Sequence, residues 1–207
     1  MLMSKDPKNV EHYFASAPKS TEKFGLVRTS LCGIYFEFLT ASSVFSKKKV
    51  DLGTRLLIEA MVLAETGCVL DIGCGYGAVG IAAAKFKPKL RVVMTDVNTR
   101  AVRLAKKNVA LNRVRTNAEV RLGSFYEPVH DSRFSCVLSN PPISAGMDTV
   151  KSIVTGAPKF LAPGGSFQMV IRSKIGAKTL PALFEETFGN CDVVARKSGF
   201  RVLMGTF

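Results

Sequence analysis

The sequence has no long hydrophobic run and few histidines. No stretch reaches the roughly 18 consecutive apolar residues of a transmembrane helix, and the opening MLMSKDPKNV lacks the apolar core of a secretory signal. The two histidines, His12 and His130, lie in polar segments and are poor candidates for catalytic bases. We therefore expect a soluble, cytoplasmic protein with no membrane partner, whose chemistry does not depend on histidine.

The cysteines include no C-x-x-C pair. Five widely spaced cysteines indicate neither a disulfide framework nor a zinc site. Internal repeats, low-complexity tracts and linkers are also missing. With 207 residues, of which 47% are hydrophobic, the chain suits one domain with a sizeable core. We expect reduced thiols, no metal, a flexible arm over residues 1–23 and a single domain over residues 24–207.

Acidic residues are scarce relative to basic ones. The 16 Asp and Glu residues against 29 Lys and Arg residues give a formal net charge of +13. Basic side chains that neutralise phosphates release condensed counterions, so this excess favours a nucleic-acid partner over a merely basic, soluble surface. Clusters occur at 85–89 and 103–108, and Lys47, Lys48 and Lys49 are candidates for contact with nucleic acid.

Short apolar strands alternate with helical patterns along most of the chain. Residues 25–40 predict a β-hairpin that turns at Cys32 and Gly33. Spacings of three and four between Leu56, Leu57, Ala60, Met61 and Ala64 predict an amphipathic helix. Further strands are predicted at 68–72, 90–96, 118–123, 134–140, 166–172, 192–197 and 200–207, with helices at 78–85, 99–111, 149–161 and 180–188.

This alternation predicts an α/β fold. Right-handed crossovers give a doubly wound, mostly parallel seven-stranded sheet with helices on both faces. Only Ser198 and Gly199 separate the last two strands, which is too short for a helical crossover, so these strands should pair antiparallel.

A glycine-rich segment, VLDIGCGYGAVGI, follows the first strand of this series. Gly73, Gly75 and Gly77 permit a tight turn and close backbone approach of a ligand to a helix N-terminus. The part GYGAVG also fits the dinucleotide motif, so a nicotinamide or flavin enzyme is an alternative. Asp71 argues against it, because a carboxylate there disfavours a pyrophosphate and suits the ammonium and sulfonium of S-adenosylmethionine.

The next two strand ends supply further candidate cofactor contacts. Asp96, followed by Val97, lies about 20 residues beyond the loop, where an acid accepts hydrogen bonds from both ribose hydroxyls. Ser124 and Phe125 follow the third strand and are candidates for the adenine edge and face. The plain alternatives are that Asp71 caps a helix, Asp96 is a turn acid and Ser124 lies in an ordinary turn.

The stretch SNPPI ends the fourth strand. The Asn140 side-chain oxygen and the Pro141 carbonyl are acceptors that can bind both hydrogens of an NH2 group and orient its lone pair toward a methyl carbon. Pro141 and Pro142 fix two φ angles and donate no hydrogen bonds, so this corner is rigid. We assign the catalytic role to these three residues. The alternative is a simple strand-ending turn.

The combination of the glycine-rich segment, Asp96 and SNPPI resembles class I S-adenosylmethionine-dependent methyltransferases with an N-P-P signature. More narrowly, SSVFSKKKVDLGTRLLIE and LFEETFGNCDVVARKSGFRVL are similar to the catalytic domain of small-subunit ribosomal RNA guanine-N2 methyltransferases and their small archaeal relatives. The resemblance covers residues 24–207. It implies a Rossmann-like methyltransferase sheet with an antiparallel final strand.

The resemblance also implies site residues. S-adenosylmethionine, with S-adenosylhomocysteine as product, would contact Phe45, Ser46 and Gly53 at its methionine end, in addition to the glycine loop and the acids at the strand ends. The substrate would lie at Asn140 to Ile143. Many family members have an aromatic residue at the position of Ile143 that stacks on the target base.

The resemblance therefore implies an enzyme that methylates an exocyclic amine, with guanine N2 in ribosomal or other structured RNA as the leading substrate. The bacterial ribosomal enzymes carry an additional N-terminal domain, so this chain, a monomer or homodimer, would engage RNA through its lysine clusters or a second subunit. Adenine N6, a protein glutamine amide and a non-catalytic RNA-binding role are the alternatives.

Overall fold

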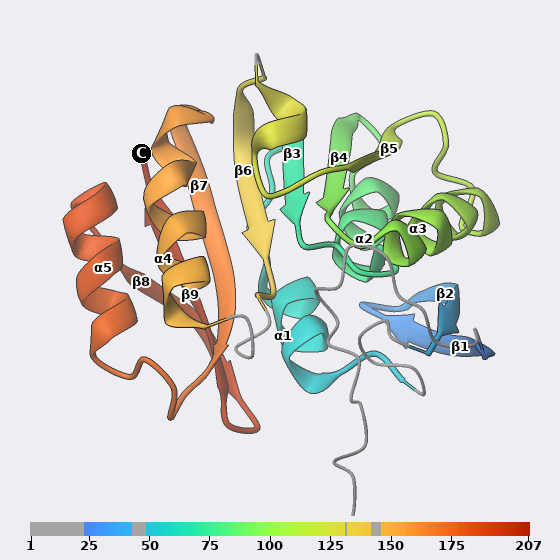
Figure 1. Cartoon of the computed structure of the whole chain (residues 1–207), viewed down its shortest axis with the longest axis horizontal. Helices are drawn as coiled ribbons and strands as arrows, with labels where there is room; N and C mark the ends of the chain where they lie inside the picture. The colour runs from blue at the N-terminus through green and yellow to red at the C-terminus, as the bar shows by residue number, and fades with distance from the viewer. Residues whose placement is uncertain (1–22, 43–48, 131, 142–145) are drawn as a thin grey trace, which may run out of the picture.

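The computed structural model describes residues 23–42, 49–130, 132–141 and 146–207. The predicted N-terminal arm, apart from Lys23, lies outside the described residues. Figure 1 shows the arrangement, whose strands and helices are, in chain order, β1 (Phe24–Leu31), β2 (Ile34–Ala41), α1 (Leu52–Ala60), β3 (Gly67–Ile72), α2 (Ala78–Phe86), β4 (Leu90–Asp96), α3 (Thr99–Leu111), β5 (Ala118–Leu122), η1 (Glu127–Val129), β6 (Phe134–Ser139), α4 (Met147–Gly156), η3 (Ala157–Lys159), β7 (Leu161–Arg172), α5 (Thr179–Phe188), β8 (Asp192–Lys197) and β9 (Phe200–Thr206).

A seven-stranded sheet forms the centre of the fold, in the order β5-β4-β3-β6-β7-β9-β8. The pairs from β5 to β7 are parallel, and β9 runs antiparallel to both β7 and β8. Ser198 and Gly199 make the tight link between β8 and β9 at positive φ angles of 50° and 79°. The predicted α/β fold class, with its antiparallel final strand, is confirmed.

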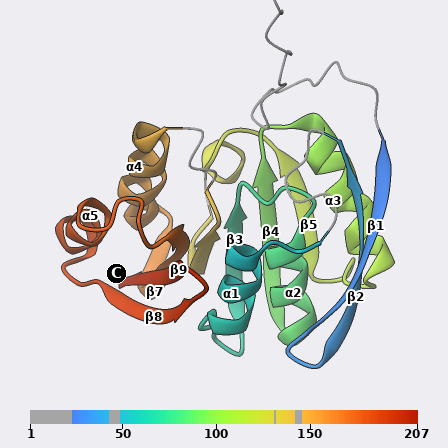
Figure 2. The same cartoon turned by 90° about the horizontal axis from the view of Figure 1, so that it is seen from below.

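Alternating side chains of the strands divide the core between the two faces of the sheet. On β3, Val69 joins the cluster formed with α1, α2, α3 and the hairpin, whereas Leu70 and Ile72 join the cluster formed with α4 and α5. Figure 2 shows α4 and α5 grouped apart from α1, α2 and α3. The sheet is therefore covered on both sides, as a parallel sheet requires.

The predicted hairpin is present as a separate two-stranded sheet, β1 and β2. Its β2 edge is paired with side chains of α3. The Asn112 amide exchanges two hydrogen bonds with the backbone of Glu37, and the Asn108 amide exchanges two with the backbone of Leu39. Each carboxamide donates and accepts one hydrogen bond, as a backbone residue of a neighbouring strand would. These contacts hold the hairpin against α3.

Two predicted helices extend further than the observed ones. α1 ends at Ala60, so Met61 and Ala64 lie outside it, because the buried Gln168 side chain takes both backbone hydrogen-bonding groups of Val62. The helix predicted over 149–161 ends at Gly156 and is followed by η3, whose second residue is Pro158. Proline lacks the N–H that would continue the α-helix.

Candidate functional site

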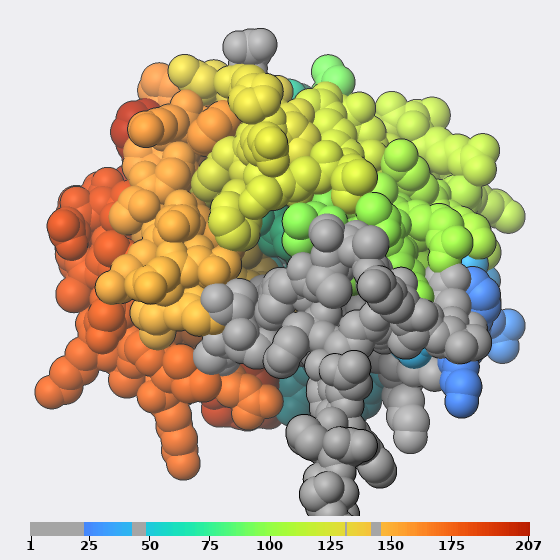
Figure 3. Space-filling view, in the orientation of Figure 1, coloured from blue at the N-terminus to red at the C-terminus, as the bar shows by residue number. Residues whose placement is uncertain are grey.

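The carboxyl ends of β3, β4, β5 and β6 bring the predicted site residues to one edge of the sheet. Asp96 is in register with Leu122 on β5, and Ile72 is in register with Ser139 on β6. Asn140, directly after Ser139, therefore lies beside the start of the glycine loop. In the space-filling view, α4 and α3 flank this side of the molecule from the left and the right (Figure 3).

The glycines of the loop differ in what surrounds them. Gly73 and Gly75 have φ angles of 68° and 59°, and a Cβ added to either would meet no atom of the described residues within 4 Å. A Cβ on Gly80 would lie 2.4 Å from Cγ of Met94, so this glycine permits close packing of α2 on β4. Gly77, at a φ of 93°, is the N-cap of α2. The first two glycines thus leave an open backbone surface at the sheet edge, suited to a ligand.

Asp71 is buried beneath this loop. Its side chain is only 1% exposed, and its Oδ2 accepts a hydrogen bond of 2.8 Å from the N–H of Gly80 in the first turn of α2. This hydrogen bond is the one expected from the alternative in which Asp71 caps the helix. Burial raises the pKa of Asp71 to about 7, the Gly80 N–H opposes the increase and the charge of Asp96 adds to it. A nearby cation would stabilise the ionised form.

Asp96 holds the loop from the neighbouring strand. Its Oδ2 accepts a 2.8 Å hydrogen bond from the N–H of Gly75, and its Oδ1 accepts one of the same length from the N–H of Asn98. Burial raises its pKa despite backbone hydrogen bonds from Asn98, Gly75 and Val97, which lower it. The two carboxylate oxygens have four lone pairs between them, so the group keeps capacity to accept a further hydrogen bond. Asp96 is therefore both a turn acid and a candidate ribose contact.

The residues predicted to meet adenine lie next to this edge. Ser124 is exposed, and its backbone N–H donates to Glu127. Phe125 has a φ of 44°, and its carbonyl accepts a hydrogen bond of 3.0 Å from the Thr95 hydroxyl. Val97 is 37% exposed. The structure brings these three residues to the strand ends; the contact of Ser124 and Phe125 with adenine, and of Val97 with the cofactor, remains a prediction.

Asn140 is held by two residues at the N-terminus of α1. Its Nδ2 lies 2.8 Å from Oγ1 of Thr54 and 3.5 Å from Oδ2 of Asp51. The Thr54 hydroxyl in turn donates to the Asp51 carboxylate. Asp51 is also the N-cap of α1 and accepts from the N–H groups of Gly53 and Thr54. The three side chains form one chain of hydrogen bonds between α1 and the end of β6.

The direction of the hydrogen bonds among Asp51, Thr54 and Asn140 determines the orientation of the Asn140 carboxamide. An ionised carboxylate can only accept hydrogen bonds. The Thr54 hydroxyl therefore gives its proton to Asp51 and presents a lone pair to Asn140. The NH2 end of Asn140 faces Thr54, and Oδ1 is the acceptor end that points away from it. The candidate catalytic oxygen is thus held in position by Asp51 and Thr54, which the sequence analysis did not assign to the site.

Several predicted site residues cannot be placed in this arrangement. Phe45, Ser46, Lys47, Lys48, Pro142 and Ile143 lie outside the described residues. Pro141 is buried and Lys49 is exposed. A Cβ on Gly53 would lie 3.0 Å from the ring of Phe200, so this glycine lets α1 approach β9; its predicted role near the methionine end remains a prediction.

Asp51 and Thr54 are the residues that sequence reasoning missed. The signal was present, since an aspartate directly before a helical pattern is a preferred N-cap. Its partner Asn140 lies far away along the chain, and only the fold brings the two together. No group of three or more His, Cys, Asp and Glu side chains within the described ranges is arranged to hold a metal ion. The same ranges contain no helix long and apolar enough to cross a membrane.

Comparisons with known proteins agree on a methyltransferase fold. The family model described as Methyltransferase small domain matches residues 35–204. An uncharacterised protein of Bacillus subtilis, YbxB, is 36% identical over 200 residues, which cover 93% of this chain and 96% of YbxB. The ribosomal RNA small subunit methyltransferase C of Shigella boydii is 34% identical over 167 residues, covering 79% of this chain and 47% of that protein.

A solved structure also aligns over most of the chain. The Thermus thermophilus 16S rRNA N2 G1207 methyltransferase, RsmC, in complex with AdoMet and guanosine, matches with a TM-score of 0.79 and 26% identity. The match covers 91% of this chain and 52% of that one. The chain thus spans about half the length of the ribosomal RNA methyltransferases that it matches.

Proposed function

Because the chain belongs to the Methyltransferase small domain family, we propose that it methylates an exocyclic amine of RNA, with guanine N2 as the target atom. The methyl donor is S-adenosylmethionine, which supplies an electrophilic methyl group on its sulfonium. One observation carries the proposal: the Asn140 carboxamide, at the carboxyl edge beside an open glycine loop, is oriented with its oxygen as the acceptor end.

The cofactor fits the residues present at this edge. Gly73 and Gly75 leave open backbone for close approach, and Asp71 offers a carboxylate whose ionised form a cationic ligand would stabilise. Asp96 keeps lone pairs for two ribose hydroxyls. These features support a cation with a ribose and disfavour a pyrophosphate, which Asp71 would repel. A nicotinamide enzyme, the alternative suggested by GYGAVG, therefore has less support.

Asn140 acts on the acceptor amine. An exocyclic amine of a base is a poor nucleophile because its lone pair is delocalised into the ring. Two acceptors, Oδ1 of Asn140 and the carbonyl of Pro141, bind its two hydrogens and orient the lone pair for attack. As the new bond forms, positive charge grows on the amine nitrogen, and the two oxygen dipoles stabilise it.

Guanine N2 is favoured over other amines by the relatives. The Thermus and Shigella proteins, by their names, act on small-subunit ribosomal RNA, the former at N2 of a guanosine. The formal net charge of +13 supports an RNA acceptor over a protein one. Adenine N6 and a glutamine amide present the same NH2 geometry to Asn140.

Replacing Thr54 with valine is expected to reduce kcat by roughly 10- to 100-fold. Valine has nearly the same shape but no hydroxyl, so Asn140 loses the partner that orients its carboxamide. Thr54→Ser keeps the hydroxyl and is the matched control, with kcat expected within about threefold of wild type. Steady-state kinetics with the methyl acceptor measure the effect, and calorimetric titration with S-adenosylhomocysteine should give the same Kd for all three proteins. An equal loss of kcat in both variants would show that packing, and not the hydroxyl, is responsible.

The affinity for S-adenosylmethionine is expected to rise as the pH increases toward about 7 and then to level off. The folded-state pKa of Asp71 is raised to about 7, so the carboxyl is largely protonated at lower pH. A cationic ligand prefers the ionised form and must displace that proton when it binds. Calorimetric titrations across this pH range measure the profile. Asp71→Asn should flatten it and weaken binding, whereas an unchanged profile in this variant would exclude Asp71 as its source.

The test of the function is methyl transfer to cellular fractions. Wild-type protein is incubated with S-adenosylmethionine carrying a radiolabelled methyl group and with total RNA, DNA or protein from the source cell. We expect label in the RNA fraction, removed by ribonuclease digestion. Label in protein instead of RNA would contradict the RNA acceptor while leaving the methyltransferase activity in place.

A further inference from the structure

A basic groove lies along the outer side of α3. It has a volume of ≈ 430 Å³ and is lined by Thr99, Val102, Arg103, Lys106, Lys107 and Arg115. Every ionisable side chain in this lining is cationic. The chain contains no acidic residue between Asp96 and Glu119, so α3 and the loop after it contribute positive charge alone. We call this surface, together with the adjacent Arg113, the α3 groove.

Four cations of the α3 groove are exposed to an external partner. Lys106, Lys107, Arg113 and Arg115 are exposed. Within the described ranges none of these four forms a salt bridge: Glu37 pairs with Arg28 on the hairpin, and Glu119 pairs with Arg91 and Arg121. Glu37 on β2 and Glu119 on β5, two strands that contact α3, are thus engaged by other arginines and do not compensate the positive charge of these four residues.

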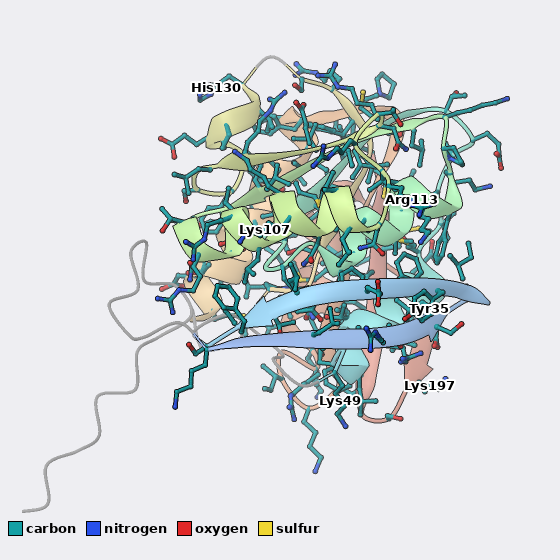
Figure 4. The ribbon with its side chains drawn as sticks, turned by 90° about the vertical axis from the view of Figure 1, so that its right-hand side faces the viewer. Tyr35, Lys49, Lys107, Arg113, His130 and Lys197 are labelled. Carbon is teal, nitrogen blue, oxygen red and sulfur yellow. The ribbon has the colours of Figure 1, made fainter. Side chains whose placement is uncertain are left out.

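The groove is built on a helix that is firmly held. Asn108 and Asn112, on the inner side of α3, fasten it to β2 through their carboxamides. The ammonium of Lys107 lies 5.6 Å from the centre of the Phe24 ring, so this side chain extends over the start of the hairpin. Figure 4 shows Lys107 and Arg113 along α3, with Tyr35 of the hairpin on the same side of the molecule. The cations therefore project from a rigid support.

The groove begins close to the candidate site along the chain. Thr99 lines it and lies only three positions after Asp96, the proposed ribose contact, at the carboxyl edge of the sheet. From there α3 runs back along the sheet, carrying Lys106 and Lys107 away from the edge. An extended polyanion with one nucleotide at Asn140 can continue past the β4 end into this groove.

We propose that the α3 groove binds the sugar-phosphate backbone of the RNA substrate. Its open shape and uniform positive charge fit a chain of phosphates, whose contacts position a nucleic acid on the protein without specifying its sequence. Binding there is electrostatic and independent of sequence, and it positions the RNA while Asn140 acts on the amine. The inference rests on the proposed RNA substrate and assigns a surface for it.

A matched pair of double variants tests the assignment. Lys106→Gln/Arg115→Gln removes two exposed cations of the groove. Arg133→Gln/Lys159→Gln removes one arginine and one lysine, also exposed and without a salt bridge in the described ranges, from the segments that precede β6 and β7. Glutamine is a good helix former, and exposed substitutions of this kind change the stability of the fold little.

Binding of a fluorescein-labelled RNA stem-loop is measured by fluorescence anisotropy between about 50 and 200 mM salt. The groove variant should bind at least roughly fivefold more weakly at the lower salt concentration, with the slope of log K against log salt reduced by about 2, since each lost phosphate contact contributes about 0.9. The control variant should match the wild type. Both variants should retain the wild-type Kd for S-adenosylhomocysteine.

Three results would overturn the inference. If the groove variant binds the stem-loop with the wild-type affinity and salt slope, or if both variants lose affinity equally, RNA does not use the α3 groove, and the proposed function is untouched. If the wild-type protein itself does not bind the stem-loop, both the proposed RNA substrate and the proposed role of the α3 groove are wrong.

Discussion

Replacing Asn140 with alanine is expected to lower kcat by about 10²- to 10³-fold, while the Kd for S-adenosylhomocysteine stays within about twofold of the wild-type value. The variant loses the oxygen that binds the amine hydrogens and stabilises the charge that develops on nitrogen. Neither interaction involves the glycine loop or the two acids beneath it. The loss should therefore appear in the chemical step, measured by single-turnover methyl transfer at saturating cofactor.

A matched control for this variant is Asn190→Ala. Asn190 is another partly buried asparagine whose carboxamide bonds the backbone of Phe188 and Thr206, on the side of the sheet formed by β8 and β9. Its loss should lower the melting temperature and leave kcat within about twofold of wild type. If Asn140→Ala turns over as fast as Asn190→Ala, the carboxamide is not part of the chemistry and SNPPI is only a strand-ending turn.

Replacing Asp96 with alanine is expected to weaken the binding of S-adenosylhomocysteine by about 100-fold or more. Hydrogen bonds to a charged group contribute about 1.5 to 3 kcal/mol each, and the variant loses two to the ribose. It also frees the N–H groups of Gly75 and Asn98, which the carboxylate holds at 2.8 Å. The loop that carries the ligand then loses its fixed shape, which adds to the loss of affinity.

Calorimetric titration measures this effect, and Asp192→Ala, which removes an exposed acid of β8, is the control. Asp96→Asn should fall between wild type and Asp96→Ala, since one amide oxygen replaces two carboxylate oxygens. An unchanged Kd in Asp96→Ala would show that Asp96 does not bind the ribose. The same titration with NAD separates the cofactor classes, because tight binding of NAD without binding of S-adenosylhomocysteine would favour the nicotinamide alternative.

The sheet could be predicted from the sequence because its determinants are local. Strand and helix periods, the glycine loop and the two-residue link at Ser198 and Gly199 are all visible within short windows. One of the two helix errors came from a long-range contact. The helix predicted to include Met61 and Ala64 ends early because Gln168, on a distant strand, binds the backbone of Val62. No window around Met61 contains that information.

In the candidate site too, some residues could be predicted from short stretches of sequence and others only from the fold. Asp71, Asp96 and Asn140 could be picked out because each ends a predicted strand, and the carboxyl ends of parallel strands share one edge. Thr54 could not, since an ordinary helix N-terminus gives no sign that its hydroxyl orients a carboxamide 86 positions later. The α3 groove could be predicted only in part. The sequence shows the basic cluster at 103–108, but only the fold adds Arg115 and shows that the cations lie on the outer side of α3 and Asn108 on the inner side.

The most direct test of the central claim is the identity of the methylated nucleoside. Wild-type protein is incubated with methyl-labelled S-adenosylmethionine and ribosomal RNA, the RNA is digested to nucleosides, and the label is located by chromatography and mass spectrometry, with Asn140→Ala in parallel. The account predicts N2-methylguanosine with the wild-type protein and almost none with the variant. Label in N6-methyladenosine, in a ribose hydroxyl or at equal levels with Asn140→Ala would contradict it.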